Sequence, residues 1–273
     1  MSSTTDVGMN FSLNRVSAMV RRYWYLLRSS WPRILDLIYW PTVQMLMWGF
    51  LQLYVSQQSN SFAAAGGVFI GAVLLWDILF RGQLGFSISF LEEMYAHNLG
   101  NLMMSPLRPV EFIAALMIMS IVRLSIGMVP VTMLAIAFFG FNLWSMGLAL
   151  AAFFVNLILT SWSIGIFVAG LLLRNGMGAE SLAWTIMFLF LPLTCVYYPV
   201  AVLPGFLQYV AWSLPPTYVF EGMRALLIDH VFRADLMVEA FIFNGVLFAA
   251  ASFAFLKLLQ SARVQGSLLQ TGE

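Results

Sequence analysis

The chain has 273 residues, of which 61% are hydrophobic and only 9% are charged. Soluble domains carry about 25% charged residues, so this composition excludes a soluble enzyme and indicates an integral membrane protein. The single cysteine, Cys195, excludes an intramolecular disulfide and thiolate-based metal sites, and the net charge of +1 says less than the positions of the 13 basic residues.

The first 33 residues contain a polar tail and then an amphipathic segment. Residues 1–10 lack the apolar stretch and the cleavage site of a signal peptide, and we expect a flexible cytoplasmic tail there. In residues 11–33, Val16, Tyr23 and Leu27 share one arc at about 100° per residue, and arginines occupy the opposite arc. This pattern predicts a helix at the membrane surface with its guanidinium groups toward lipid phosphates. The alternative is a solvated helix that packs on a partner protein.

Residues 34–260 have the pattern of a transmembrane domain. A span needs about 20 apolar residues, and the charge-poor stretches of that length predict an all-α fold with six transmembrane helices. The residues that follow, 261–273, are expected to form a cytoplasmic tail. The predicted spans are 37–55, 66–91, 112–139, the stretch from the turn at 140–147 to residue 174, 181–198, and 238–259.

Basic residues determine the predicted orientation, because lysine and arginine are retained on the cytoplasmic side. With the N-terminus inside, only Arg224 and Arg233 fall outside. The chain is therefore expected to be a multi-pass protein with both termini in the cytoplasm. The basic residues expected inside are Arg15, Arg21, Arg22, Arg28, Arg33, Arg108, Arg174, Lys257 and Arg263.

Three charged residues, Asp77, Arg81 and Arg123, fall inside predicted spans. Asp77 and Arg81 are one helical turn apart, so their side chains can pair. A lone charge at the bilayer centre costs about 2.5 to 3.5 kcal/mol, which makes these residues candidates for a functional site. They either line a substrate path or a moving seam, or they form a structural ion pair that locks the second span to the third. Both arrangements give the same sequence signature.

A cytoplasmic segment, residues 92–111, has a more regular sequence pattern than a simple connector requires. It begins with a carboxylate pair, continues with apolar side chains that suit a helix, and is stopped by Pro106 and Pro109. We expect a short helix across the membrane axis whose Met and Tyr side chains bind another protein. The alternative is a loop that only joins two spans. The candidate docking residues are Glu92, Glu93, Tyr95, Leu99 and Met103.

An outer segment, residues 197–235, is apolar but interrupted by prolines, so it cannot be one continuous span. We expect two short helices that form a lid or an exit gate. Glu221 and Arg224, three residues apart, can pair on the second of them. The alternative is a cap that only seals the outer leaflet. The candidate gate residues are Pro199, Pro204, Pro215, Glu221 and Arg224.

The familiar motifs of enzymes are missing from the sequence. His97 and His230 fall on opposite sides of the predicted membrane, so they cannot share a metal, and we expect no metal site. No serine lies in a GxSxG motif. The only lysine, Lys257, lies in FLKLL rather than in a phosphate-binding loop, so we expect neither a cofactor in this chain nor a nucleic-acid partner.

The order of these elements resembles the permease subunit of type-two ATP-binding-cassette (ABC) exporters, a family that exports drugs, lipids and polysaccharides. The resemblance covers nearly the whole chain. NLGNLMMSPLRPVEF is similar to the family's coupling segment with its Ser105-Pro106 pair, and residues 11–33 look like its N-terminal gate helix. The most specific stretch, YYPVAVLPGFLQYVAWSLPPTYVFEGMRALL, carries Pro199, Leu203-Pro204, Leu214-Pro215, Tyr218, Glu221 and Arg224.

The resemblance implies how such a chain works. Two permease subunits, a homodimer in preference to a heterodimer, would form the path in the bacterial inner membrane in contact with lipid. A separate ATPase subunit would bind ATP and Mg and move the segment 92–107, with Glu92 and Glu93 as partners for its basic residues. Spans one, two and five would line the path, with Trp40, Trp48, Trp76 and Phe188 as lining candidates.

The path-lining candidates indicate the general chemistry of the substrate. An aromatic surface with few polar groups favours an amphipathic substrate, lipid-like or drug-like, and a polysaccharide or lipo-oligosaccharide is the alternative. An integral membrane enzyme and a passive membrane scaffold are the alternatives of another class.

Overall fold

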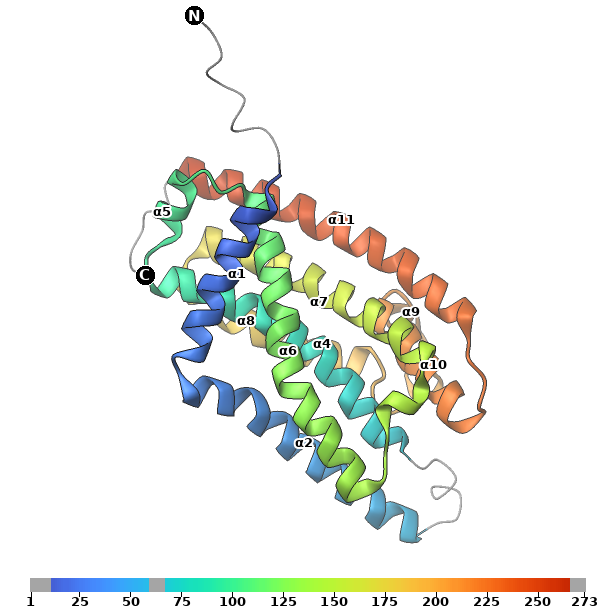
Figure 1. The fold of residues 1–273 in the computed structure, drawn as a ribbon. Helices are drawn as coiled ribbons and strands as arrows, with labels where there is room; N and C mark the ends of the chain where they lie inside the picture. Colours follow the sequence, from blue (N-terminus) through green and yellow to red (C-terminus); the bar gives the residue numbers. More distant parts are fainter. Residues whose placement is uncertain (1–10, 59–66, 266–273) are drawn as a thin grey trace, which may run out of the picture.

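The computed structural model describes residues 11–58 and 67–265, and within them every regular element is helical (Figure 1). The predicted tail at 1–10 and the end of the predicted tail at 261–273 lie outside the described residues. The elements are α1 Leu13–Arg28, α2 Trp31–Gln58, α4 Val68–Tyr95, α5 Leu99–Met104, α6 Pro109–Phe139, η1 Leu143–Met146, α7 Leu148–Asn175, η2 Met177–Ala179, α8 Ser181–Leu193, η3 Val200–Val202, α9 Gly205–Trp212, α10 Pro215–Ile228 and α11 Ala234–Gln265.

Five of the described helices, α2, α4, α6, α7 and α11, are long and apolar enough to cross a membrane. The predicted fifth span, 181–198, contains instead the 13-residue helix α8. At about 1.5 Å per residue, a helix of this length covers about 20 Å of a hydrocarbon core of about 30 Å. The sequence pattern overestimated its length because Pro192 lies in its last turn and Cys195 has a left-handed backbone with φ 54°. The six-span count is therefore not confirmed.

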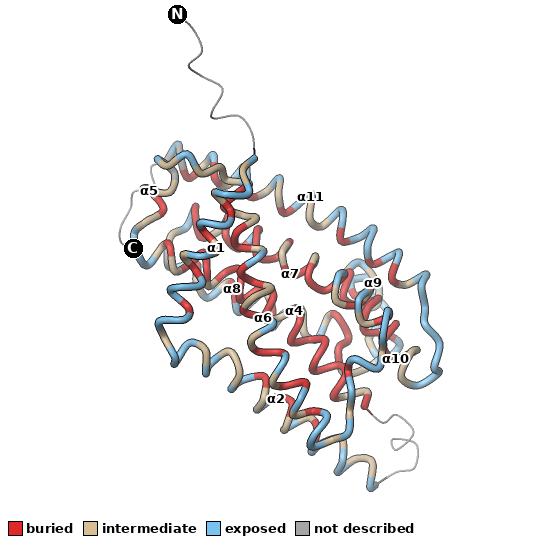
Figure 2. The backbone as a smooth tube through the Cα atoms, viewed as in Figure 1, coloured by how far each residue is buried: buried red, intermediate tan, exposed pale blue. Residues whose placement is uncertain are grey.

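Helix α4 lies at the centre of the bundle, and 89% of its most apolar 18-residue segment is buried. It packs against α6 and α7, while α2 covers α4 and α6 from one side and α11 covers α7 from the other (Figure 1). The corresponding 18-residue segments of α2 and α11 are only 17% and 22% buried. Figure 2 shows the outer faces of these two helices in the exposed colour. Apolar helices that expose this much surface are suited to lipid or to a second subunit.

Small and polar side chains let the central helices approach closely. The Ser161 hydroxyl of α7 donates to the Leu79 carbonyl of α4 at 2.8 Å. Between α7 and α11, Asn244 donates to the Asn156 carbonyl at 3.0 Å and accepts from the Thr160 hydroxyl at 2.6 Å. Hydrogen bonds of this kind stabilise helix association where lipid offers no hydrophobic driving force.

The predicted surface helix at 11–33 divides into two elements. Helix α1 ends at Arg28, and α2 begins at Trp31 with Pro32 in its first turn, a position that proline favours. The apolar arc of α1, with Tyr23 and Leu27 fully buried, packs on α6 rather than facing the membrane. Arg15 and Arg22 of α1 pair with carboxylates of the same chain, and the position of α1 at the membrane surface stays a prediction.

Candidate functional site

Three arginines near the N-terminus, and Arg123 of α6, form ion pairs with carboxylates at the ends of α4 and α6. We call this set the charge clasp. It joins α1 and the start of α2 to the part of the bundle from which α5 emerges. Its members are Arg15, Arg22, Arg33, Arg123, Glu92, Glu93 and Glu111.

The first pair of the charge clasp is bidentate. Arg15 donates from Nη2 and Nε to the two Glu111 oxygens at 2.6 and 2.8 Å. The buried Glu111 carboxylate also accepts the backbone N–H groups of Ser12 at 2.8 Å and Arg108 at 3.1 Å. The hydrogen bond to Glu111 raises the pKa of Arg15, so this guanidinium stays charged. Four donors satisfy this buried carboxylate, as a stable buried charge requires.

The other two carboxylates of the charge clasp are adjacent in the sequence. Glu93, buried, accepts from Arg22 at 2.5 Å and from the Asn98 amide at 2.9 Å. Glu92 bridges two arginines, Arg33 at 2.9 Å and Arg123 at 2.8 Å. The predicted group of three intramembrane charges is therefore divided, because the long Arg123 side chain reaches Glu92 and not Asp77.

The candidate docking residues occupy different environments. The carboxylates of Glu92 and Glu93 are held by arginines of the same chain, a role that the sequence did not predict, and their role toward an ATPase stays a prediction. Tyr95 is exposed, and its hydroxyl donates to Glu180 in the turn before α8. Leu99, the first residue of α5, is buried, and the Met103 side chain lies outside the described residues. The exposed side chains of this segment include Tyr95 and Met104.

The Asp77–Arg81 pair is present in the buried centre of α4. The Arg81 Nε lies 3.5 Å from Asp77 Oδ1, and Asp77 is fully buried. This separation is beyond the range of a charge-assisted hydrogen bond, which is about 2.7 to 2.9 Å. The pair is thus electrostatic, in contrast to the tight contacts of the charge clasp.

The outer segment contains the two short helices that its prolines predict, α9 and α10. Pro204 precedes the first and Pro215 begins the second, and Pro199 precedes η3. These positions suit proline, which has no N–H to leave unpaired.

The Glu221–Arg224 pair holds the turn that precedes η3. Arg224 lies 2.9 Å from Glu221 and donates to the Cys195 carbonyl, also at 2.9 Å. Glu221 accepts the Val200 backbone N–H at 2.7 Å. The sequence predicted the ion pair, but no local pattern connects it to a turn about 25 residues earlier, because helix spacing reports only neighbours three and four apart.

The candidate path-lining aromatic residues do not form one surface. Trp48 stacks on Tyr197 with ring centroids 4.2 Å apart. Trp76 is buried beside Phe80, and Phe80 also contacts Phe188 of α8 at 6.0 Å. Trp40 is exposed on α2 and contacts only Tyr39 among the described aromatic rings. Phe80 therefore links Trp76 to Phe188, while Trp40 and Trp48 make other ring contacts, and the path-lining role of all four stays a prediction.

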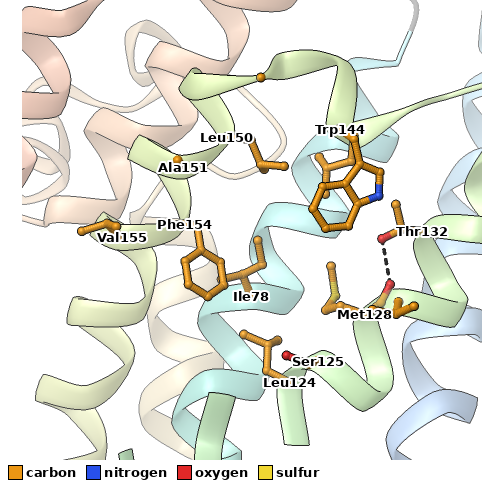
Figure 3. A pocket seen from close by; sticks show the side chains of 13 residues that line it. Ile78, Leu124, Ser125, Met128, Thr132, Trp144, Leu150, Ala151, Phe154 and Val155 are labelled. Carbon is orange, nitrogen blue, oxygen red and sulfur yellow. Dashed lines mark hydrogen bonds between the residues drawn. The ribbon is translucent and has the colours of Figure 1, made fainter. Parts of the chain in front are cut away.

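A cavity of about 600 Å³ lies between α6, η1 and α7, with Ile78 of α4 also lining it (Figure 3). The hydroxyls of Ser125 and Thr132 point into this region but donate to carbonyls of their own helix at 2.8 and 2.7 Å. The lining is otherwise apolar, so the cavity suits hydrocarbon rather than a polar ligand. No sequence pattern predicted it, because its walls come from separate helices.

Among the described residues every regular element is a helix, and five of these helices are long and apolar enough to cross a membrane, which is the architecture of a multi-pass membrane protein. The residues that the structure describes contain no group of His, Cys, Asp and Glu that could hold a metal. The family model for the ABC-2 type transporter matches residues 15–228, and the chain belongs to this family.

The matched family describes a membrane transport domain, and the match covers no nucleotide-binding domain. Permeases of this family work with an ATPase on a separate subunit. A search of curated proteins returned no match to the chain.

Proposed function

We propose that this chain is the permease subunit of an ABC exporter. Two copies form the path for an amphipathic substrate, lipid-like or drug-like, in a bacterial inner membrane, with both termini in the cytoplasm. A separate ATPase subunit that binds ATP and Mg drives transport. The observation that carries the proposal is the family match over residues 15–228.

The segment between α4 and α6 supports a docking role for this end of the molecule. Tyr95, which lies shortly before the short helix α5, and Met104, at the end of α5, are both exposed. Apolar and aromatic side chains of this kind form the anchors of protein interfaces. The charge clasp connects the same segment to α1 and α2, so a displacement of α5 is transmitted to the first span.

Copurification tests the proposal. The tagged chain is purified from its native host in detergent or nanodiscs, and ATP hydrolysis is measured for wild type, Tyr95→Ala and Tyr209→Ala. Tyr209 is an exposed tyrosine of α9 in the predicted outer segment and serves as the matched control. We expect an ATPase to copurify with wild type and Tyr209→Ala, and its amount or coupling to fall by about tenfold in Tyr95→Ala, as for loss of an interface anchor. Purification of the chain without any ATP-hydrolysing partner would contradict the proposal.

A further inference from the structure

Several buried polar atoms of the described residues have no hydrogen-bond partner, and three of them belong to the Asp77–Arg81 pair. Neither carboxylate oxygen of Asp77, nor the Nε of Arg81, has a hydrogen-bond partner among the described residues. An unsatisfied buried polar atom lowers stability, and a charged one lowers it more. The charge clasp shows that this chain can satisfy buried charges, since the Glu111 contacts lie at 2.6 to 3.1 Å.

A purely structural ion pair would be expected to close in the same way. Asp77 and Arg81 lie on one helix, one turn apart, at 3.5 Å. Asp36 of α2 is a second carboxylate that acts electrostatically on Arg81. The Asp77 carboxylate therefore remains available as a hydrogen-bond acceptor, and the Arg81 Nε–H remains available as a donor.

We propose that the Asp77–Arg81 pair binds the polar head group of the transported amphiphile, and that this head group has no net charge and both donates and accepts hydrogen bonds. The inference rests on the proposed function and adds the head-group chemistry. Asp77 requires a donor and Arg81 Nε requires an acceptor. An anionic head group is repelled by Asp77 and a cationic one by Arg81, so a zwitterionic or hydroxyl-bearing group satisfies both.

Helix α2 controls access to this site. A Cβ atom at Gly127 of α6 would lie 2.6 Å from the Leu37 carbonyl of α2 and 3.8 Å from the Arg81 side chain, so α2 passes close to Arg81. Farther along α2, the Trp48 ring stacks on Tyr197, which acts electrostatically with Asp77. Helix α2 is also the least buried of the candidate spans, so its displacement would uncover the pair.

Binding of defined lipids to the purified permease tests the proposal. The probes are fluorescent short-chain phosphatidylethanolamine, phosphatidylglycerol and a dialkyl trimethylammonium lipid, which are zwitterionic, anionic and cationic. The test variant Asp77→Leu/Arg81→Met removes both charges and keeps the volume apolar, a change that buried ion pairs often tolerate. Asp77→Asn removes the charge and keeps the shape. The control, Arg233→Met/Asp235→Leu, removes an exposed ion pair at the beginning of α11.

Wild type and the control should bind the zwitterionic lipid about tenfold more tightly than the other two, the effect of one or two hydrogen bonds to charged groups. Both Asp77 variants should lose this preference and remain monodisperse. Equal binding of the three probes by wild type, or an unchanged preference in Asp77→Leu/Arg81→Met, would overturn the inference. These outcomes are independent of ATPase copurification, so failure of the head-group site is distinguishable from failure of the proposed function.

Discussion

Arg224 is a single side chain on which the geometry of the outer segment depends. It joins α10 to the carbonyls of Cys195 and Val196, where the backbone enters the left-handed region. A non-glycine residue in that region is strained and persists only when its surroundings fix it. The buried Cys195 thiol, the only one in the chain, therefore reports whether this turn is closed.

Maleimide labelling of Cys195 tests this role of Arg224. Burial raises the pKa of the Cys195 thiol to about 11, so at pH 8 the reactive thiolate is scarce and labelling of wild type should be slow. In Arg224→Met the turn should open and labelling at pH 8 should increase by about tenfold as the thiol pKa returns toward about 8.5. Arg233→Met, which removes an exposed arginine, is the control.

The direction of the change in labelling rate distinguishes a turn that opens in Arg224→Met from a turn that stays closed. Arg224 lowers the thiol pKa by its charge, so its removal from a turn that stays closed would raise the pKa further and slow the labelling. Faster labelling therefore shows opening, and slower labelling contradicts it. In wild type the labelling rate should rise as the pH approaches 11.

At the scale of elements, α2 is held against α6 by a close backbone approach. Gly127 allows the Leu37 carbonyl to lie where a side chain would otherwise stand, whereas a Cβ atom at Gly245 of α11 would meet nothing within 4 Å. The two glycines thus differ in what a methyl group would contact, although both lie inside long helices.

Alanine substitution at these two glycines has opposite expected effects. Gly127→Ala should force α2 away and destabilise the protein by about 1 to 3 kcal/mol, the usual cost of overpacking. Gly245→Ala should be neutral or stabilising by up to about 1 kcal/mol, because glycine is unfavourable inside a helix. Thermal unfolding in detergent measures both. Equal stability of the two variants would show that α2 is not tightly held.

At the scale of the whole molecule, two apolar faces are exposed, one on α2 and one on α11 (Figure 2). Met47 of α2 and Phe241 of α11 are 58% and 56% exposed, so they are matched reporters of the two faces. The family resemblance places the first span along the path between subunits, which favours the α2 face as the contact with a second copy.

Cysteine crosslinking distinguishes the two faces. In a Cys195→Ala background, Met47→Cys should form an intermolecular disulfide in the membrane, and Phe241→Cys should stay monomeric because lipid covers α11. The yields are compared by non-reducing electrophoresis. Efficient crosslinking through Phe241→Cys alone would assign the interface to α11 instead.

The sequence by itself determined what depends on near neighbours: the helical class, the positions of the long apolar helices, the amphipathic character of α1 and the proline-broken outer segment. Hydropathy and proline act within a few residues, so they can be read along the chain. The i,i+4 pair Asp77–Arg81 was predicted for the same reason.

Only the tertiary structure decided which distant groups meet. Arg15 pairs with Glu111 across 96 positions and Arg22 with Glu93 across 71, and this pairing ties α1 to the bundle. The shortness of α8, the pinning of the Cys195 turn and the apolar cavity also arise from several helices at once. A buried charge accepts whichever partner the packing brings within hydrogen-bond distance, and no local pattern contains that information.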